Sequence, residues 1–319
     1  MTIEVRGLTK RYGEKTAVDD LTFTVRPGTV TGFLGPNGAG KSTTMRLIVG
    51  LDAPTRGSVT VNGRHYARHP APLAEIGALL EARSVHTGRS ASKHLLALAL
   101  THGIPRSRVE EVIEAVGLGG AARKRAGGFS LGMGQRLGIA AALLADPAAV
   151  VLDEPVNGLD PEGVLWIRTL LKDLAAQGRT VFVSSHLMSE MALTAEHLIV
   201  VGRGRLLADT TVAEFVRSAG RDEVSLRSPE AGRLRELLAG PGVEVASDAP
   251  GELRVRGVGA EDIGLTAAAH GVPLFELTPH RVSLEEAFME LTRDAVEYHA
   301  HPHVAEERGG QDRHEEVAA

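Results

Sequence analysis

The chain of 319 residues contains no cysteine, which excludes a disulfide framework and any thiolate metal site. It also lacks any uninterrupted apolar run near the roughly 18 residues that a membrane-spanning helix needs. Its first segment, MTIEVRGLTKRYG, alternates like a strand and does not resemble a signal peptide. These absences predict a protein that is cytosolic or attached peripherally to a membrane.

The chain has no excess of positive charge either. Its 35 Lys and Arg residues against 40 Asp and Glu give a net charge of −5, with both signs interspersed. A nucleic-acid-binding protein needs a basic surface to neutralise phosphates, so nucleic acid is not an expected partner. The 43% of apolar residues can bury a sizeable core, and the length predicts two domains.

The end of the chain, residues 300–319, has no hydrophobic periodicity and predicts a disordered tail. His299, His301 and His303 stand at alternate positions here. A metal clip is conceivable at these histidines, but nothing nearby in the sequence fixes ligand geometry, so a solvated tail is the preferred interpretation.

From residue 29 on, short apolar strands end in loops that open helices. The segment TVTGFLG precedes a predicted helix at 41–49, AAVVLDEP precedes one at 164–176, and TVFVSSH precedes one at 188–196. Such alternation predicts a parallel sheet covered by helices. The β-rich segments before residue 29 predict antiparallel strands, and residues 91–145 predict a mainly helical arm.

After residue 221 the pattern changes to a β-α-β-β-α-β order, which predicts a ferredoxin-like unit. No motif of catalytic or metal-binding type occurs in it. It ends in an amphipathic helix in which Ser283 and Glu286 fit a capping box. An apolar stripe on this helix suggests dimer contact or regulation; it comprises Leu284, Ala287, Phe288 and Leu291.

One segment, GPNGAGKS at residues 35–42, matches the phosphate loop G-x-x-x-x-G-K-[ST] in full. Its glycines allow backbone N–H groups to surround a β-phosphate. Lys41 would contact the β- and γ-phosphates, and the Ser42 hydroxyl would bind Mg²⁺. The motif lies between a predicted strand and a predicted helix, which is the context it requires.

Two further strands end in polar side chains. Asp153 and Glu154 follow an apolar strand, where Asp153 would hold Mg²⁺ through water and Glu154 would polarise the attacking water. His186 follows the strand that should lie beside the phosphate-loop strand. We expect its neutral imidazole to donate to a γ-phosphate.

A second helix start suited to an anion lies in FSLGMGQRLGIAAAL, residues 129–143, where Ser130 is placed as an N-cap. These motifs, in their order and spacing, resemble the nucleotide-binding subunits of ATP-binding-cassette (ABC) transporters over about residues 2–215. The resemblance implies an α/β P-loop NTPase cassette with an antiparallel β subdomain and a helical arm. Together with the β-α-β-β-α-β order after residue 221, the resemblance predicts a cassette followed by a small ferredoxin-like α+β domain.

The boundaries that follow are 1–218 for the cassette, with its helical subdomain at about 85–146, then 219–299 for the accessory domain and 300–319 for the tail. The resemblance further implies that Tyr12 stacks on adenine, that residues 157–160 form the D-loop and that His186 is the switch histidine. Asp153 becomes the Walker B aspartate and Glu154 the catalytic glutamate. The implied ATP-binding Walker A residues are Gly35, Pro36, Asn37, Gly38, Ala39, Gly40, Lys41, Ser42 and Thr43.

The chain departs from the family pattern in two places. Glu81 replaces the usual Gln of the switch loop; its oxygen can still ligate Mg²⁺ but adds a negative charge. The signature, usually L-S-G-G-Q, reads FSLGM, keeping Ser130 and Gly132. Both variants resemble the subgroup of bacitracin- and anthracycline-type exporters, in which a separate six-helix membrane chain is the partner.

The function implied is an ATP-hydrolysing motor, at the cytoplasmic face of the cell membrane, that exports drugs, antibiotics or lipid-like compounds. Its cofactors would be ATP and Mg²⁺, and its partners a second ATP-binding subunit, as a homodimer, and transmembrane permease subunits. In such a dimer Ser130 and Gly132 face the ATP of the opposing subunit. Two alternatives stay open, namely a non-transport ABC ATPase and a nucleotide-switched binding module with weakened hydrolysis.

Overall fold

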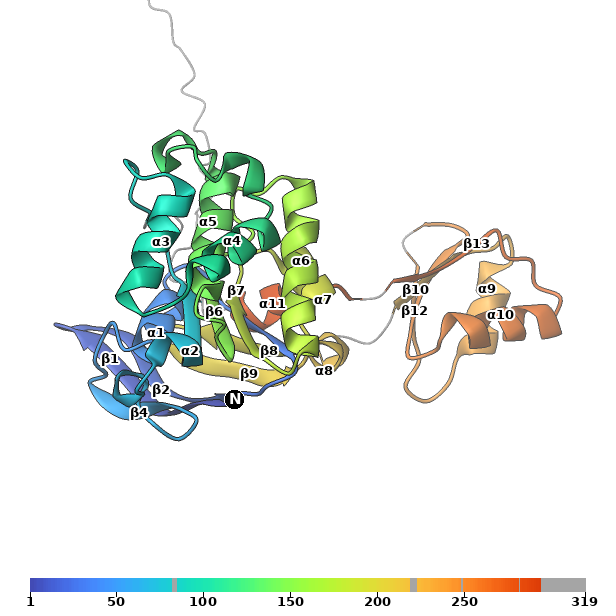
Figure 1. The fold of residues 1–319 in the computed structure, drawn as a ribbon. Coiled ribbons are helices and arrows are strands. Elements are labelled where there is room, and N and C mark those ends of the chain that lie inside the picture. The colour runs from blue at the N-terminus through green and yellow to red at the C-terminus, as the bar shows by residue number, and fades with distance from the viewer. Residues whose placement is uncertain (82–84, 219–222, 248, 281, 294–319) are drawn as a thin grey trace, which may run out of the picture.

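The computed structural model describes residues 1–293 apart from 82–84, 219–222, 248 and 281. The predicted tail and its histidines lie outside the described residues. The described part forms three sheets with helices between and around them (Figure 1). No helix in it is long and apolar enough to cross a membrane.

The central sheet carries the predicted strand-loop-helix motifs. Its strands pair in parallel except for the last pair, β8 with β9, which is antiparallel. The phosphate-loop strand is flanked by the strand that ends before His186, as predicted. In spatial order the strands are β5 (Ile76–Leu79), β6 (Ala149–Asp153), β7 (Thr180–Ser184), β3 (Val30–Leu34), β8 (His197–Gly202) and β9 (Arg205–Thr211).

An antiparallel sheet covers one face of the central sheet, which confirms the predicted antiparallel strands. Phe23 of this second sheet packs on Phe33 and Phe182 of the central sheet, with ring centroids 5.8 and 5.9 Å away. Burial of these rings joins the two sheets into one apolar core. Its strands, in spatial order, are β2 (Lys15–Val25), β1 (Ile3–Tyr12) and β4 (Arg56–Val61).

Helices complete both faces of the central sheet. Alternate residues of β3 point to opposite sides: Phe33 joins the core shared with the antiparallel sheet, whereas Val30 and Leu34 join the core beneath the helical arm. The helices of this part are α1 (Lys41–Ile48), α2 (Pro72–Glu75), α3 (Ala91–Thr101), α4 (Arg106–Ala115), α5 (Leu131–Leu143), α6 (Pro161–Ala176), α7 (Met188–Thr194) and α8 (Val212–Ser218), with short 3₁₀ turns at Tyr66–Arg68, Gly119–Ala121 and Ala126–Gly128.

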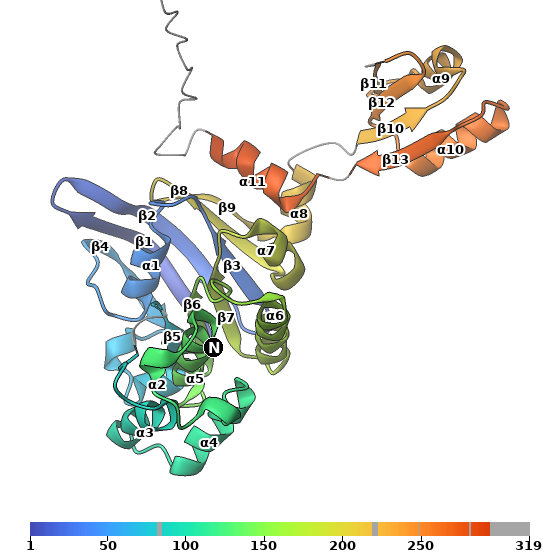
Figure 2. The same cartoon turned by 90° about the horizontal axis from the view of Figure 1, so that it is seen from above.

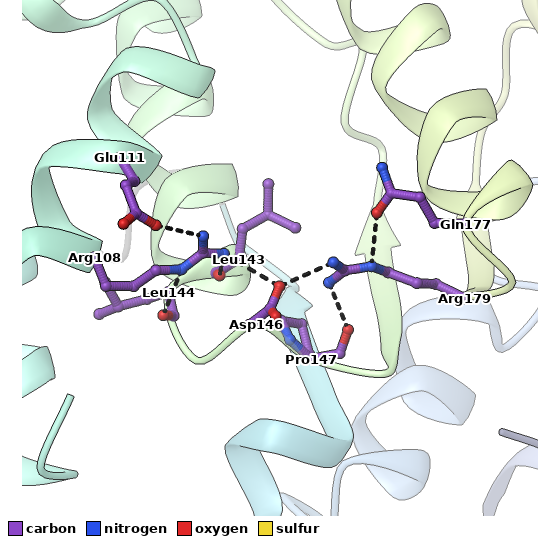
Figure 3. A network of polar contacts seen from close by, with 8 residues as sticks. All are labelled: Arg108, Glu111, Leu143, Leu144, Asp146, Pro147, Gln177 and Arg179. Carbon is purple, nitrogen blue, oxygen red and sulfur yellow. Dashed lines mark hydrogen bonds and ion pairs between the residues drawn. The ribbon is translucent and has the colours of Figure 1, made fainter. Parts of the chain in front are cut away.

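A polar network ties the helical arm to the sheet (Figure 3). Arg108 of α4 donates to the carbonyl oxygens of Leu143 and Leu144 at the end of α5, at 3.0 and 3.4 Å. Asp146 then lies between Arg108 and Arg179, with nitrogen–oxygen distances of 3.3 and 2.9 Å. The arm is therefore anchored where α5 leads back into β6.

The segment after residue 222 forms a third sheet with its own apolar core. All its strand pairs are antiparallel, and the order places the second and third strands on one side of the first and the fourth on the other. This confirms the predicted ferredoxin-like pattern. In spatial order the strands are β11 (Glu244–Ala246), β12 (Glu252–Arg256), β10 (Glu223–Arg227) and β13 (Glu276–His280), and the helices are α9 (Ala231–Leu238) and α10 (Ala260–Ala269).

The last described helix, α11 (Leu284–Thr292), begins with the predicted capping box of Ser283 and Glu286. It packs against α7 and α8 of the cassette (Figure 2). Leu284 and Ala287 are buried in the same apolar core as those helices. The stripe predicted for dimer contact or regulation is thus mostly covered by the cassette itself, because an apolar helix face packs on whichever apolar surface the fold brings to it. The domain boundaries stay a prediction.

Candidate functional site

The loop between β3 and α1 wraps around the amino group of Lys41. The side chain of Lys41 is 7% exposed, and its Nζ donates to the carbonyl oxygens of Gly35 at 2.6 Å and Pro36 at 3.2 Å. Among the described residues, no side chain caps the start of α1. The N–H groups of its first turn and a buried cation therefore face the same space, which is suited to an anion.

Two glycines in this loop allow the backbone to pass close to its neighbours. Gly40 has φ of 97°, and a Cβ there would overlap the carbonyl oxygen of Ala17. A Cβ at Gly35 would overlap the carbonyl oxygen of Val201. The loop can adopt this shape only with glycine at both positions.

A cavity of about 410 Å³ lies in front of the loop. Tyr12, residues 37–43, Asp153 and Glu154 are among the residues that line it. Burial lowers the pKa of Lys41, and the negative charges of Glu154 and Asp153 oppose this shift. The cavity thus combines a desolvated cation, a glycine-shaped loop and a helix N-terminus, and these features fit a nucleoside triphosphate.

One buried hydroxyl connects the two acidic residues of the site. Asp153, the last residue of β6, pairs in register with Ser184, the last residue of β7. The Ser184 hydroxyl donates to Asp153 Oδ1 and accepts the backbone N–H of Glu154 at 3.0 Å. The carboxyl ends of the two parallel strands thereby fix both predicted acidic residues beside the phosphate loop.

Glu154 and His186 contact each other directly. His186 Nδ1 lies 2.8 Å from Glu154 Oε2, and the backbone N–H of His186 donates to the same oxygen at 3.3 Å. His186 is exposed and Glu154 half-buried. A carboxylate able to accept a proton and an imidazole therefore meet at the edge of the phosphate-loop cavity.

The three predicted magnesium ligands line one cavity. Ser42, Glu81 and Asp153 contribute to a cavity of about 500 Å³ between the phosphate loop and the helical arm. In the described part of the chain, no three His, Cys, Asp or Glu side chains gather into a metal-binding group. A hydroxyl and two carboxylates suit Mg²⁺, which is usually held by one or two carboxylates together with phosphate oxygens and water.

Tyr12 also lines the phosphate-loop cavity and is 49% exposed. Its hydroxyl donates to Asp52 at 3.0 Å, and Asp52 also accepts from Arg46 of α1 at 2.8 Å. Burial and the bond to Asp52 raise the pKa of Tyr12. Lys10 Nζ lies 4.8 Å from the ring centroid. The ring is thus held at the cavity as an exposed aromatic surface, which suits stacking on a base.

Ser130 and Gly132 do not reach this cavity. They open α5, where Ser130 Oγ accepts the N–H of Met133 at 3.2 Å. Leu131, which replaces a family glycine, is seated on Gly158 so closely that a Cβ at Gly158 would overlap it. The N-terminus of α5, the second helix start suited to an anion, therefore lies apart from the chain's own phosphate loop and packs against the chain's own D-loop.

Several residues of the site were not anticipated from the sequence. Ser184 contacts the Asp153 carboxylate and the backbone N–H of Glu154, Asp52 anchors Tyr12, and Gln135 Nε2 donates to the carbonyl oxygen of Glu154 at 3.2 Å. A strand-ending serine beside a strand-ending aspartate is a signal that could have indicated Ser184. Nothing local in the sequence indicates the other two contacts, which join distant segments.

Comparison with known families gives two matches. The family described as ABC transporter matches residues 18–157. A domain of unknown function, DUF8746, matches residues 222–285. The first match contains the phosphate loop, the signature and both carboxylates, and the second lies over the ferredoxin-like unit.

Curated relatives extend the similarity. The bacitracin transport ATP-binding protein of Bacillus licheniformis is 41% identical over 210 residues, which are 65% of this chain and 69% of that protein. The daunorubicin resistance ATP-binding protein of Streptomyces coeruleorubidus is 32% identical over 317 residues, covering 92% of this chain and 96% of that protein. The second similarity therefore spans the cassette and the segment after it.

Solved structures share the cassette fold. A structure described as an ATP-binding subunit of an ABC transporter superposes with a TM-score of 0.63 and 27% identity, over 68% of this chain and 93% of that one. A structure described as a dimeric bacterial ABC transporter cassette gives a TM-score of 0.60 and 25% identity, over 66% and 98%. In both comparisons the matched region includes nearly the whole of the solved chain.

Proposed function

This chain belongs to the ABC transporter family as an ATP-binding subunit that hydrolyses ATP, and from that premise we propose that it is the motor of a drug or antibiotic exporter. The observation that carries the proposal is the contact of Glu154 with His186 beside the buried Lys41. A binding module that only switches with nucleotide has no need of this carboxylate. The named transport of bacitracin and resistance to daunorubicin in its relatives support the export of such compounds.

The hydrolytic step uses the residues around the cavity. A water molecule attacks the γ-phosphorus, its proton passes to Glu154, and the bond from the γ-phosphorus to the bridging oxygen breaks to give ADP and phosphate. Among contacts of the described residues, Glu154 accepts through Oε2 alone, so Oε1 is available to the water. Lys41 stabilises charge on the phosphates. Mg²⁺, held by Ser42, Asp153 and Glu81, would neutralise charge on the phosphate oxygens.

A second copy of the chain completes the site. Ser130 and Gly132 lie outside the chain's own cavity, yet their helix start is suited to a γ-phosphate. Two chains packed head to tail would place each Ser130 on the opposing ATP. A cassette of similar fold is described as dimeric, which supports the pairing of two chains. Leu131 packs on Gly158 of its own chain. Its side chain narrows the space through which the opposing ATP would reach this helix start, but the Ser130 hydroxyl is kept.

The membrane partner would be a separate permease, with this chain bound peripherally at the cytoplasmic face. The cavity beside Glu81 lies between the phosphate-loop core and the helical arm, so closure of the dimer changes the surface offered to that partner. Loss of the γ-phosphate then reopens the pair. Specificity for the transported compound would reside in the permease.

Mixed dimers test the shared site. Ser130→Arg and Lys41→Ala chains should each lose hydrolysis when alone, whereas a mixture of both contains dimers with one intact site. We expect ATPase activity to reappear on mixing, because one site takes its phosphate loop from one chain and its Ser130 from the other. A mixture that stays inactive, or a Ser130→Arg chain with unchanged turnover, would contradict the shared site.

Co-expression tests transport. The gene beside this one should encode a membrane protein of about six spans of ~20 apolar residues each. Together they should protect a sensitive bacterium against bacitracin or an anthracycline, and replacement of this chain by Glu154→Gln should abolish protection. Equal protection by the Glu154→Gln pair would overturn the proposed motor role.

A further inference from the structure

The backbone of Glu154 has a conformation that glutamate seldom adopts. Its φ is 51°, in the left-handed region that favours glycine, asparagine and aspartate. Such a residue persists only where surrounding contacts hold it, and residues of this kind gather at catalytic sites. The orientation of the Glu154 carboxylate towards His186 therefore depends on the contacts that hold the Glu154 backbone.

Two side chains hold this backbone, one on each side of the residue. The N–H of Glu154 donates to Ser184 Oγ at 3.0 Å. Its carbonyl oxygen accepts from Gln135 Nε2 at 3.2 Å. Ser184 comes from the end of β7 and is fully buried, and Gln135 comes from α5 and is 1% exposed. The two contacts approach Glu154 from elements that the chain brings together only by folding.

Packing alone does not explain why a glutamine is buried at position 135. Its amide donor is engaged by Glu154, while its Oε1 has no hydrogen-bond partner among the described residues. A half-paired buried amide is less favourable than an apolar side chain of similar shape. A glutamine at this place is explained by the bond to Glu154, which leucine or methionine could not make.

Helix α5 also touches the loop after Glu154 at its first turn. Leu131 is seated on Gly158, and a Cβ at Gly132 would lie 3.2 Å from the Gly158 carbonyl oxygen. The start of α5 and the loop from Glu154 to Gly158 are thus in contact at two places, at Gly158 through the first turn and at Glu154 through Gln135.

We propose that Gln135 is a positioning residue for Glu154, holding its left-handed backbone so that the carboxylate is aimed for hydrolysis. The inference rests on the proposed function in taking Glu154 as the base and Ser130 as a contact to the opposing ATP. Since Gln135 and Ser130 lie on one helix, engagement of the opposing nucleotide by Ser130 is transmitted through α5 to the base of the chain's own site. The two sites of the dimer are linked through this amide.

The activity test compares Gln135→Leu with the parent chain. The substitution keeps the size and removes the donor, so kcat should fall by about 10²-fold, the scale of a small misplacement at a reacting centre. The Kd for a fluorescent ATP analogue should stay within about twofold, because Gln135 does not line the nucleotide cavity. Gln177→Leu, at an exposed glutamine outside the site, should match the parent in both. An unchanged kcat in Gln135→Leu would overturn the proposal.

A stability cycle tests the proposed cause without any activity. Gln135→Leu is made in the parent and in a Glu154→Gly background, where a positive φ has no steric cost. The loss of thermal midpoint caused by Gln135→Leu should be smaller in the glycine background, because there is no strained backbone left to hold. The same loss in both backgrounds would contradict the positioning role. If Glu154 proves not to be the base, the proposed function fails while this result still stands.

Discussion

His186 Nδ1 lies 2.8 Å from Oε2 of Glu154. Because an ionised carboxylate only accepts, the hydrogen-bond network assigns the proton of this contact to Nδ1. The Nε2 of a neutral ring is then an acceptor. The sequence-based expectation of a neutral imidazole that donates to the γ-phosphate therefore requires the ring to leave Glu154, or to flip, once ATP is bound.

Replacement of His186 by alanine should impair chemistry more than binding. The expected loss in kcat is about 10²–10³-fold, the range measured for loss of one donor at a developing charge. The Kd for ATP should change little, since the ring does not line the phosphate-loop cavity. Steady-state ATPase assays and equilibrium titration of the purified chain measure the two quantities. His270→Ala, at an exposed histidine of the ferredoxin-like unit, is the matched control, and equal kcat values for both variants would contradict the assignment.

His94 should make stability depend on pH. Burial lowers its pKa, and the nearby Arg89 and His86 lower it further. The unfolded chain therefore binds a proton at this residue more readily than the folded chain. Its contribution to stability is complete well above about pH 6.5, the ordinary pKa of histidine, and is lost as the pH falls through that value towards the folded pKa.

The measurement is the urea midpoint at about pH 7.5 and about pH 5.5, for the parent and for His94→Gln. Other groups titrate equally in both proteins, so their effects cancel in the comparison. The parent should lose more stability on acidification than His94→Gln does. A variant with the same loss, or a larger one, would show that His94 does not titrate as its environment implies.

The sequence predicted the phosphate loop and the acidic strand ends because each depends on local order. A strand, a glycine loop and a helix follow one another between Val30 and Ile48, and the parallel sheet then brings Asp153 and Ser184 to the same edge. Such information lies within short windows of sequence, in apolar runs and in the residues that end them.

Contacts between distant segments could not be predicted in this way. The periodicity of residues 284–292 shows that one helix face is buried, yet it does not identify what buries it, and the structure places it on α7 and α8. The bond from Gln135 to Glu154 likewise joins residues whose proximity results only from the packing of α5 on the sheet. Which side chains of distant segments meet is decided by the tertiary packing of the elements that carry them.

The packing of α11 on the cassette predicts unequal effects of two neighbouring substitutions. Leu284 is 3% exposed within the cassette core, whereas Met289 on the same helix is 64% exposed. Leu284→Ala should lower the free energy of unfolding by about 2–5 kcal/mol, the usual range for a buried leucine. Met289→Ala should change it by less than about 0.5 kcal/mol. Urea unfolding followed at Trp166, which lies in the cassette, measures both, and equal effects would place α11 away from the cassette.

The central claim is that this chain hydrolyses ATP with Glu154 as the base, and its most direct test is the ATPase activity of Glu154→Gln. The amide has nearly the same shape but does not accept a proton from water, so turnover should fall by about 10²–10⁴-fold, the contribution of general base catalysis. ATP binding should persist, since Lys41 and the phosphate loop are unchanged. A Glu154→Gln chain that binds ATP and hydrolyses it as fast as the parent would contradict the account.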